Sequence, residues 1–294
     1  MQPALQDLEP TVVLPAVADA GDWRQTRLGS WLGASHRVLK PLSSGAYGHV
    51  YLAEHVALGT LVAAKFSLPS QPLAASVLRQ EASVLARLAH SNIVGYRKFG
   101  LADEGGAYLL MEYARGIELE SWLAQHGPMP AERALGVLEQ LAAAVDYLHA
   151  HDHVHADLKP THVMLDEARG DRIKLLDFGC AFDCRDSRQS RDVAGTPGYM
   201  APEQARGEQC GPAIDIYALA ALASELLTGS LPHTHTTRSV MRAVLCEPPT
   251  LPSARGLSRP GLDACFARAL HKKPHERFAT AGEFVDAIRL AFAS

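Results

Sequence analysis

The chain has 294 residues, of which 47% are hydrophobic and 20% are charged, and its formal net charge is -4. This length is enough to bury a sizeable core in one large domain or in two lobes. The slightly acidic balance argues against a nucleic-acid partner, and no apolar run is long enough to predict a membrane span. The start lacks the features of a secretory signal, and the five cysteines are irregularly spaced, which predicts a cytoplasmic protein with reduced thiols.

Residues 1–33 are predicted to form a flexible N-terminal tail, because they combine prolines and acidic residues with no sustained periodicity. Thr11 stands in this tail between acidic and apolar residues. Two interpretations of it remain open: a loose strand or coil, or a phosphorylated docking site that recruits a phosphothreonine-binding domain as partner.

A small β-rich lobe is predicted over residues 34–111. Its strands are short segments of β-branched and aromatic residues separated by glycine-containing turns, and a helix is indicated by apolar residues at helical spacing. We expect strands at 36–42, 48–55 and 60–68, a helix at 74–90, and two further strands within 93–113 around a turn at 103–106.

After a connector at 112–118, residues 119–294 are predicted to form a larger, mainly helical lobe. Its expected helices span 120–127, 131–151, 212–229, 239–247, 262–272 and 281–293. Residues 152–203 are rich in loops, with two short strands at 162–166 and 173–177. The fold class is therefore α+β, with a five-stranded lobe carrying one helix beside a helical lobe.

Three features of the small lobe are suited to binding phosphate. Gly45 and Gly48 lie in a turn between two strands, where the absence of a side chain lets the backbone approach an anion. Lys65 follows an apolar run on the third strand, so its ammonium is expected to be buried or to face a cleft and to need a partner. Glu81, in the middle of the helix, can supply that carboxylate.

The segment HADLKPTHVMLD at 155–166, followed by DFG at 177–179, makes the pattern specific. With GTPGYMAPEQ at 195–204 and DIYALA at 215–220, the chain resembles the eukaryotic-type, or Hanks-type, protein kinase family over residues 36–291. The style of the later motifs is most similar to bacterial serine/threonine kinases. The resemblance implies a two-lobed kinase fold that transfers the γ-phosphate of ATP to serine or threonine hydroxyls of proteins, including its own.

The resemblance also implies which residues bind ATP. Gly45 and Gly48 would cover its phosphates, and Lys65 would hold the α- and β-phosphates while pairing with Glu81. The remaining positions that match the family's nucleotide site are Leu42, Ser43, Val50, Ala63, Met111, Glu112 and Ala114, with Met111 behind the pocket and the connector backbone at 112–114 against adenine.

For the transfer step, the resemblance makes Asp157 the base that accepts the proton of the attacking hydroxyl. Lys159 would neutralise charge on the moving phosphoryl group, Thr196 would support both residues, and Asp177 would bind Mg²⁺ or Mn²⁺. Away from the chemistry, Glu203 and Arg277 match a buried structural ion pair, and Asp215 matches a residue that braces the catalytic loop.

Three residues depart from the family's pattern. Ser43 replaces the first glycine of the phosphate loop, for which we expect a mild effect. Ala156 replaces the arginine that receives the phosphate of the activation loop. His162 replaces the asparagine that binds the second magnesium ion. Imidazole suits softer metals than magnesium, which leaves three possibilities open. His162 ligates manganese, or a single metal ion is enough for transfer and His162 binds none, or His162 impairs the site.

These departures leave two alternatives to an active protein kinase. One is a pseudokinase scaffold that binds nucleotide and transfers phosphate weakly or not at all. The other is a small-molecule phosphotransferase, against which the APE element and its preceding threonine argue. The histidine-rich stretch 148–166 is not predicted to be a metal cluster. His149 and His155 match structural positions, His151 and His153 are interpreted as incidental, and only His162 falls at a metal position.

The absence of the arginine at Ala156 predicts that activity depends little on phosphorylation of the activation loop, since no guanidinium is present there to order the loop around a phosphate. Separate Ser187→Ala and Ser190→Ala variants should keep their phosphotransfer rate within about twofold of the wild type. A radiometric assay of the two variants measures this. Collapse of activity in either one would contradict the prediction.

Overall fold

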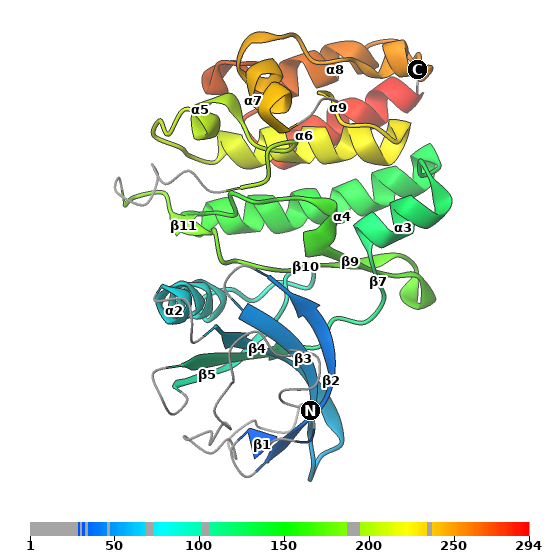
Figure 1. Cartoon of the computed structure of the whole chain (residues 1–294). Helices are drawn as coiled ribbons and strands as arrows, with labels where there is room; N and C mark the ends of the chain where they lie inside the picture. The colour runs from blue at the N-terminus through cyan, green and yellow to red at the C-terminus, as the bar shows by residue number, and fades with distance from the viewer. Residues whose placement is uncertain are drawn as a thin grey trace. The chain divides into compact units, whose positions relative to one another are not determined.

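A computed structural model of the chain describes residues 29, 31–32, 35–45, 48–68, 73–101, 106–186, 195–233 and 237–293 (Figure 1). The chain divides into two compact units. Unit 1 comprises Met1–Ala89 and Val94–Ala114, and unit 2 comprises His90–Ile93 and Arg115–Ser294. The division at Ala114 falls inside the predicted connector.

Unit 1 is built on one antiparallel sheet with the strand order β1-β2-β3-β4-β6-β5. The five predicted strands are confirmed, and the predicted helix ends earlier than expected, at Leu85. An additional strand, β1, lies within the segment that we expected to be flexible, because two residues are too few to show periodicity. The elements are β1 (Trp31–Leu32), β2 (His36–Ser44), β3 (Gly48–His55), β4 (Thr60–Ser67), α2 (Ala74–Leu85), β5 (Tyr96–Leu101) and β6 (Ala107–Glu112).

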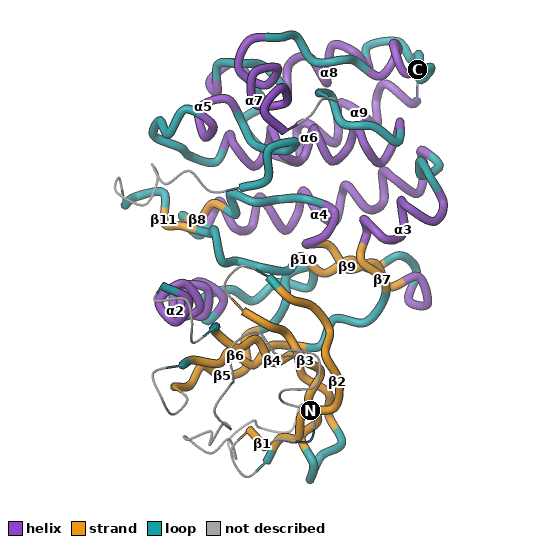
Figure 2. Tube along the Cα trace, viewed as in Figure 1, coloured by secondary structure: helices purple, strands orange, loops and turns teal. Residues whose placement is uncertain are grey.

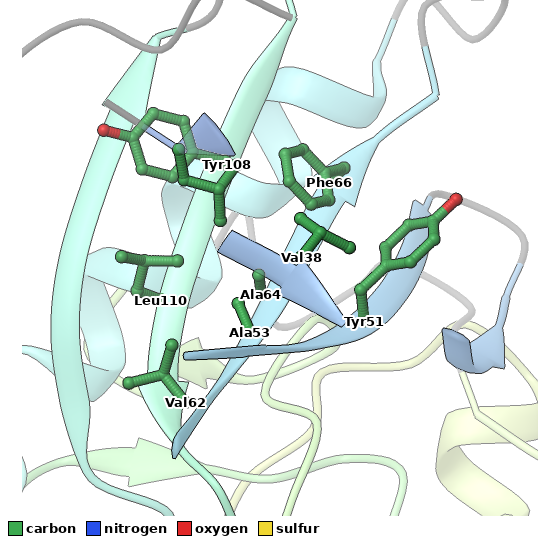
Figure 3. Close-up of a cluster of buried hydrophobic side chains, with 9 residues drawn as sticks. Val38, Tyr51, Ala53, Val62, Ala64, Phe66, Tyr108 and Leu110 are labelled. Carbon is green, nitrogen blue, oxygen red and sulfur yellow. The ribbon is translucent and has the colours of Figure 1, made fainter. Parts of the chain in front are cut away.

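The two faces of this sheet carry different sets of residues, because successive side chains of a strand point to opposite faces. One face carries a buried apolar cluster, most of which is shown in Figure 3: Leu32, Val38, Tyr51, Ala53, Val62, Ala64, Phe66, Tyr108 and Leu110. The register pairs Val50 with Lys65 and Ala63 with Met111, so these four predicted ATP-site residues share the opposite face.

Unit 2 is mainly helical, with two small sheets that carry its loops (Figure 2). Its helices are α3 (Leu119–His126), α4 (Ala131–Ala150), α5 (Pro202–Ala205), α6 (Ala213–Thr228), α7 (Thr237–Cys246), α8 (Leu262–Ala269) and α9 (Ala281–Ala293). One sheet joins β7 (Ile117–Glu118), β9 (Val163–Asp166) and β10 (Arg172–Leu175), and the other pairs β8 (His153–Val154) with β11 (Phe182–Asp183). Short 3₁₀ turns lie at Pro160–His162, Glu167–Arg169, Pro252–Arg255 and Pro274–Glu276.

The core of unit 2 lies around α6. Nearly all residues of this helix are buried, as expected of a helix that is apolar on every side, and it packs against α4, α8 and α9. Asp146 on α4 caps α9: its two carboxylate oxygens accept from the N–H groups of Ala281 at 2.8 Å and Gly282 at 2.9 Å. Within the described ranges, no helix has both the length and the apolar character needed to cross a membrane.

Two buried histidines face each other in unit 1. His36 on β2 pairs with His55 on β3, and their ring centroids are 4.8 Å apart in an edge-to-face arrangement. The Nδ1 atom of His36 lies 3.1 Å from the hydroxyl of Ser35. Burial, reinforced by His55 and Lys98, lowers the pKa of His36 to about 4. The neutral imidazole therefore belongs to the folded state.

This pKa predicts that unit 1 loses stability in mild acid. The folded-state pKa lies below the ordinary value of about 6.5, so the unfolded chain binds the extra proton and stability falls as the pH drops from about 6.5 towards 4. Between pH 7.5 and pH 5, protonation of His36 in the unfolded chain should lower the free energy of unfolding by about 2 kcal/mol. Urea unfolding at both pH values measures this loss. The His36→Phe variant, which cannot titrate, should show a smaller loss by that amount; an equal loss would contradict the assignment.

Candidate active site

Lys65 and Glu81 form a buried ion pair in unit 1. The Nζ atom of Lys65 on β4 lies 2.7 Å from Oε2 of Glu81 on α2, and the two side chains are 14% and 1% exposed. A carboxylate that is almost fully buried is stable only when it is paired or hydrogen-bonded. The predicted pairing is therefore present, and it fixes the lysine ammonium on the sheet face that also carries Val50 and Met111.

The glycine turn between β2 and β3 is tightly constrained at one glycine. A Cβ atom on Gly48 would overlap the carbonyl oxygen of Phe66 on the neighbouring strand, so a larger residue would force the strands apart. The N–H of Gly45 donates to the carbonyl of Gly48 at 2.8 Å and closes the turn. Leu42 and Ser43 precede it and are exposed. Residues 46–47, at its tip, lie outside the described ranges.

The strand that leads into the connector is held by Gly95. The N–H of Glu112 donates to the Gly95 carbonyl at 2.7 Å, and Oε2 of Glu112 accepts from the Gly95 N–H at 3.1 Å. Met111 and Ala114 on either side are buried. The Glu112 N–H is therefore already hydrogen-bonded within unit 1. A ligand at this strand would have to bind other backbone N–H or carbonyl groups.

In unit 2, the carboxylate of Asp215 organises the loop that carries the predicted base. It is fully buried at the start of α6 and accepts three hydrogen bonds: from the N–H of His155 at 2.8 Å, the N–H of Ala156 at 2.9 Å, and Nε2 of His149 at 2.8 Å. Burial alone would raise the pKa of Asp215, yet the hydrogen bond and charge of His149, with the backbone donors, hold it below its usual value. The predicted bracing contact is thus present.

Asp157, Lys159 and Thr196 form a closed triangle of hydrogen bonds. The Nζ atom of Lys159 donates to Oδ2 of Asp157 and to the hydroxyl of Thr196, both at 2.7 Å. That hydroxyl donates in turn to Oδ1 of Asp157 at 2.8 Å. Each carboxylate oxygen has a positioned donor, so the base, its cationic neighbour and the supporting threonine are held in one geometry before any substrate binds.

His162 and Asp177 face each other beside this triangle. Nδ1 of His162 lies 2.9 Å from the carbonyl oxygen of Asp157, and Nε2 lies 3.6 Å from Oδ2 of Asp177. A carbonyl oxygen only accepts, so Nδ1 is the protonated nitrogen and Nε2 carries the lone pair. Burial, only partly offset by Asp177 and Asp157, lowers the pKa of His162 to about 4, which keeps the ring neutral near pH 7.

These two side chains fit a divalent cation. Two ligand atoms that are each about 2.1 Å from an ion lie about 3.0 Å apart at a right angle and farther apart at wider angles, which accommodates the 3.6 Å between Nε2 and Oδ2. Asp177 has φ +53° and its Oδ1 accepts from the N–H of Gly179 at 3.1 Å. Among the described residues, no group of three or more His, Cys, Asp or Glu side chains is placed to hold a metal ion.

Three of the four other histidines of the stretch 148–166 have structural roles. His149 binds Asp215, as described above, and His155 is fully buried with its ring edge against Phe178, at a centroid distance of 5.0 Å. His151 is exposed. The interpretation of His153 as incidental was wrong, because it is 4% exposed and its Nδ1 lies 2.6 Å from the carbonyl of His151. Strand pairing with Asp183 buries it, which the histidine spacing alone could not indicate.

Two side chains near the end of the segment 195–204 are buried and polar. Glu203 receives two parallel hydrogen bonds from Arg277, at 2.7 and 2.8 Å, which confirms the predicted pair. Gln204 was missed by the sequence interpretation: its Nε2 donates to the carbonyl of Ala156 at 2.7 Å. An amide beside a carboxylate in an amphipathic segment carries no local signal that it is buried.

Thr11, Ser187 and Ser190 lie outside the described ranges.

Comparisons with known proteins agree with this geometry. A family described as the protein kinase domain matches residues 36–286. The serine/threonine-protein kinase PknH of Mycobacterium bovis is 34% identical over 272 residues, which cover 89% of this chain and 44% of that protein. Pkn1 of Myxococcus xanthus is 34% identical over 270 residues, covering 88% and 38%. PknE of Mycobacterium tuberculosis is 32% identical over 279 residues, covering 92% and 48%.

A β-rich unit with a lysine–glutamate pair and a helical unit with an aspartate–lysine–threonine triangle define the phosphotransferase class of fold. The match over residues 36–286 assigns the particular family: the chain belongs to the protein kinase domain family and resembles its bacterial, Hanks-type serine/threonine members. The expected α+β kinase fold is confirmed. The chain spans less than half the length of these three relatives.

The Glu203–Arg277 pair predicts a large stability loss when its charge is removed. Its side chains are 4% and 0% exposed, so Glu203→Gln leaves a buried guanidinium without its counter-ion and should destabilise unit 2 by about 3 kcal/mol. Urea unfolding followed by circular dichroism measures this. The exposed pair Arg206–Glu208 provides the control: Glu208→Gln should change stability by less than about 0.5 kcal/mol. Equal losses in the two variants would contradict the assignment.

Proposed function

We propose that this chain is a serine/threonine protein kinase that transfers the γ-phosphate of ATP to protein hydroxyls, including its own. The closed triangle of Asp157, Lys159 and Thr196 is the observation that carries the proposal. Phosphoryl transfer needs little covalent chemistry from a protein. It needs a positioned acceptor for the hydroxyl proton and cations where charge spreads over phosphate oxygens.

Each side chain of the triangle has one task in this proposal. Asp157 orients the attacking hydroxyl and accepts its proton. Lys159 contacts Asp157 at 2.7 Å and supplies the positive charge that the transferred group needs. Thr196, which donates to Oδ1 of Asp157, limits rotation of the carboxylate. The same threonine favours serine or threonine over tyrosine as acceptor, as the resemblance implied.

Unit 1 supplies the nucleotide-binding residues of this proposal. Lys65, fixed by Glu81, would hold the α- and β-phosphates, and the turn of Gly45 and Gly48 would lie over them. The remaining predicted contacts to ATP are Leu42, Ser43, Val50, Ala63, Met111, Glu112 and Ala114. Their support is the shared sheet face of Val50, Ala63, Lys65 and Met111.

Asp177 and His162 are proposed as the metal ligands of the chain. A bound divalent cation would neutralise phosphate charge. Because Nε2 of His162 carries the lone pair towards Asp177, the ligand from this position would be nitrogen instead of the amide oxygen of asparagine. Nitrogen ligands favour manganese over magnesium, so we propose that the site accepts Mg²⁺ and prefers Mn²⁺.

Several parts of the proposal remain predictions from sequence: the protein substrates, a phosphothreonine-binding partner at Thr11, and the cytoplasmic location. The competing function is a pseudokinase scaffold, in which His162 blocks the metal position. The intact triangle and the orientation of the Nε2 lone pair favour the active enzyme.

Loss of the base should abolish transfer. Asp157→Ala should lower the rate at least about 100-fold, because a positioned base contributes on that order. Incorporation of γ-phosphate into the chain and into a generic protein substrate, with Mg²⁺ or Mn²⁺, measures this. If the wild type incorporates no phosphate with either metal, and Asp157→Ala makes no difference while nucleotide still binds, the pseudokinase interpretation replaces this one.

Nitrogen coordination should be visible by spectroscopy. Electron spin-echo modulation of Mn²⁺ bound with a non-hydrolysable ATP analogue should show coupling to nitrogen in the wild type, and the coupling should weaken or vanish in His162→Asn. The same substitution should shift the ratio of Mn²⁺ to Mg²⁺ affinity towards Mg²⁺ by about tenfold. His151→Asn, which changes an exposed histidine of the same stretch, is the control. An identical spectrum in wild type and His162→Asn would eliminate the histidine as a ligand.

A further inference from the structure

The backbone of Ala156, the residue before the base, is held in an unfavourable conformation by two side chains. Its φ is +65°, a left-handed value that costs a residue with a Cβ conformational energy. Its N–H donates to Oδ1 of Asp215 at 2.9 Å, and its carbonyl accepts from Nε2 of Gln204 at 2.7 Å. Both backbone polar groups of Ala156 are thus hydrogen-bonded to distant parts of the chain.

Gln204 is built into the structure at both ends of its amide. The residue is 4% exposed, its Oε1 accepts from the N–H of Ala201 at 3.3 Å, and its Nε2 faces the carbonyl of Ala156. These partners fix the amide orientation, since only the NH₂ end can donate to a carbonyl. Without Gln204, the Ala156 carbonyl would lose this partner in a buried environment, which is unfavourable.

Gly195 lies directly over this hydrogen bond. A Cβ at Gly195 would be 2.9 Å from Nε2 of Gln204 and 3.0 Å from the carbonyl oxygen of Ala156, and the glycine has φ +123°. The next residue, Thr196, donates to Asp157. The Gln204 amide therefore joins three segments: the catalytic loop, the start of the segment 195–204, and helix α5.

By the family resemblance, the position of Ala156 carries an arginine that links the catalytic loop to the activation loop when the latter is phosphorylated. Alanine cannot make that link. We infer that Gln204 is a positioning residue that ties the end of the activation segment to the catalytic loop through a neutral amide, and that this link is present without phosphorylation. This inference rests on the proposed kinase function and deepens it.

The test compares Gln204→Met, which keeps length but has no donor, with the phosphatase-treated wild type. The treated wild type should keep its activity within about twofold. Gln204→Met should lose about tenfold in kcat while its KM for ATP stays within twofold, because the loss of one buried hydrogen bond misplaces Asp157 and Thr196 without touching the residues proposed to bind nucleotide. Gln204→Glu, whose carboxylate cannot donate, should behave alike and serves if the methionine variant does not fold.

Gln140→Met is the matched control. Gln140 is also a partly buried amide of unit 2, with Nε2 donating to the carbonyl of Asp171 at 2.9 Å. Its hydrogen-bond partners among the described residues lie outside the triangle. This variant should keep its kcat within twofold even if its melting temperature falls. An equal loss of kcat in Gln140→Met, unchanged kcat in both Gln204 variants, or inactivation of the wild type by phosphatase would each overturn the inference.

Hydrogen exchange gives a readout that does not depend on phosphate transfer. The backbone amides of residues 155–158 should exchange about tenfold faster in Gln204→Met than in the wild type, and at the wild-type rate in Gln140→Met. Unchanged exchange in Gln204→Met would contradict the inference even in an active kinase. If the wild type proved inactive, the proposed function would fail while this measurement still decided the role of Gln204.

Discussion

The buried carboxylate of Asp215 is the constraint on which the catalytic half of this molecule depends. An ionised group inside a protein must be compensated by hydrogen bonds or charge, and here the compensation comes from the peptide N–H groups of His155 and Ala156 and from His149. The need to satisfy this one carboxylate therefore dictates the course of the loop that leads into Asp157. A helix in the apolar core thus sets the geometry of the loop that carries the predicted base.

Each unit also neutralises its functional lysine internally. Lys65 is paired with Glu81 in unit 1, and Lys159 with Asp157 in unit 2. The conformational entropy of these long side chains is therefore lost when the chain folds. Binding of a nucleotide or a substrate does not have to order them again. Preorganised charge of this kind is the main way in which proteins stabilise a transition state that spreads negative charge over several oxygens.

The sequence indicated which element carries each of these candidate residues, because spacing along the chain holds that information. The order of Lys65, Glu81, Asp157, Lys159 and Asp177 was enough to place each on its element. It could not predict features that arise from contacts between distant segments. The left-handed backbone of Ala156 is imposed by Asp215 and Gln204, 59 and 48 residues away, and an isolated alanine has no tendency to adopt it.

In unit 1, too, some features follow from the local sequence and others from contacts between distant segments. Short segments of β-branched and aromatic residues predicted its strands, and the alternation of side chains along them separates the apolar cluster from the face that carries Val50, Lys65 and Met111. The burial of His36 against His55 depends on the register between β2 and β3, which the composition of neither strand reveals. Similarly, β1 is defined only by its partner, because two residues have no periodicity of their own.

The cap that Asp146 provides for α9 has a consequence for how the chain folds during synthesis. The carboxylate is made 135 residues before the first N–H that it will bind. At the usual rate of translation this interval lasts about 7–27 s. Throughout that time α4 lacks its packing partner α9, so unit 2 emerges from the ribosome as a partly assembled bundle and completes its core only when α9 arrives.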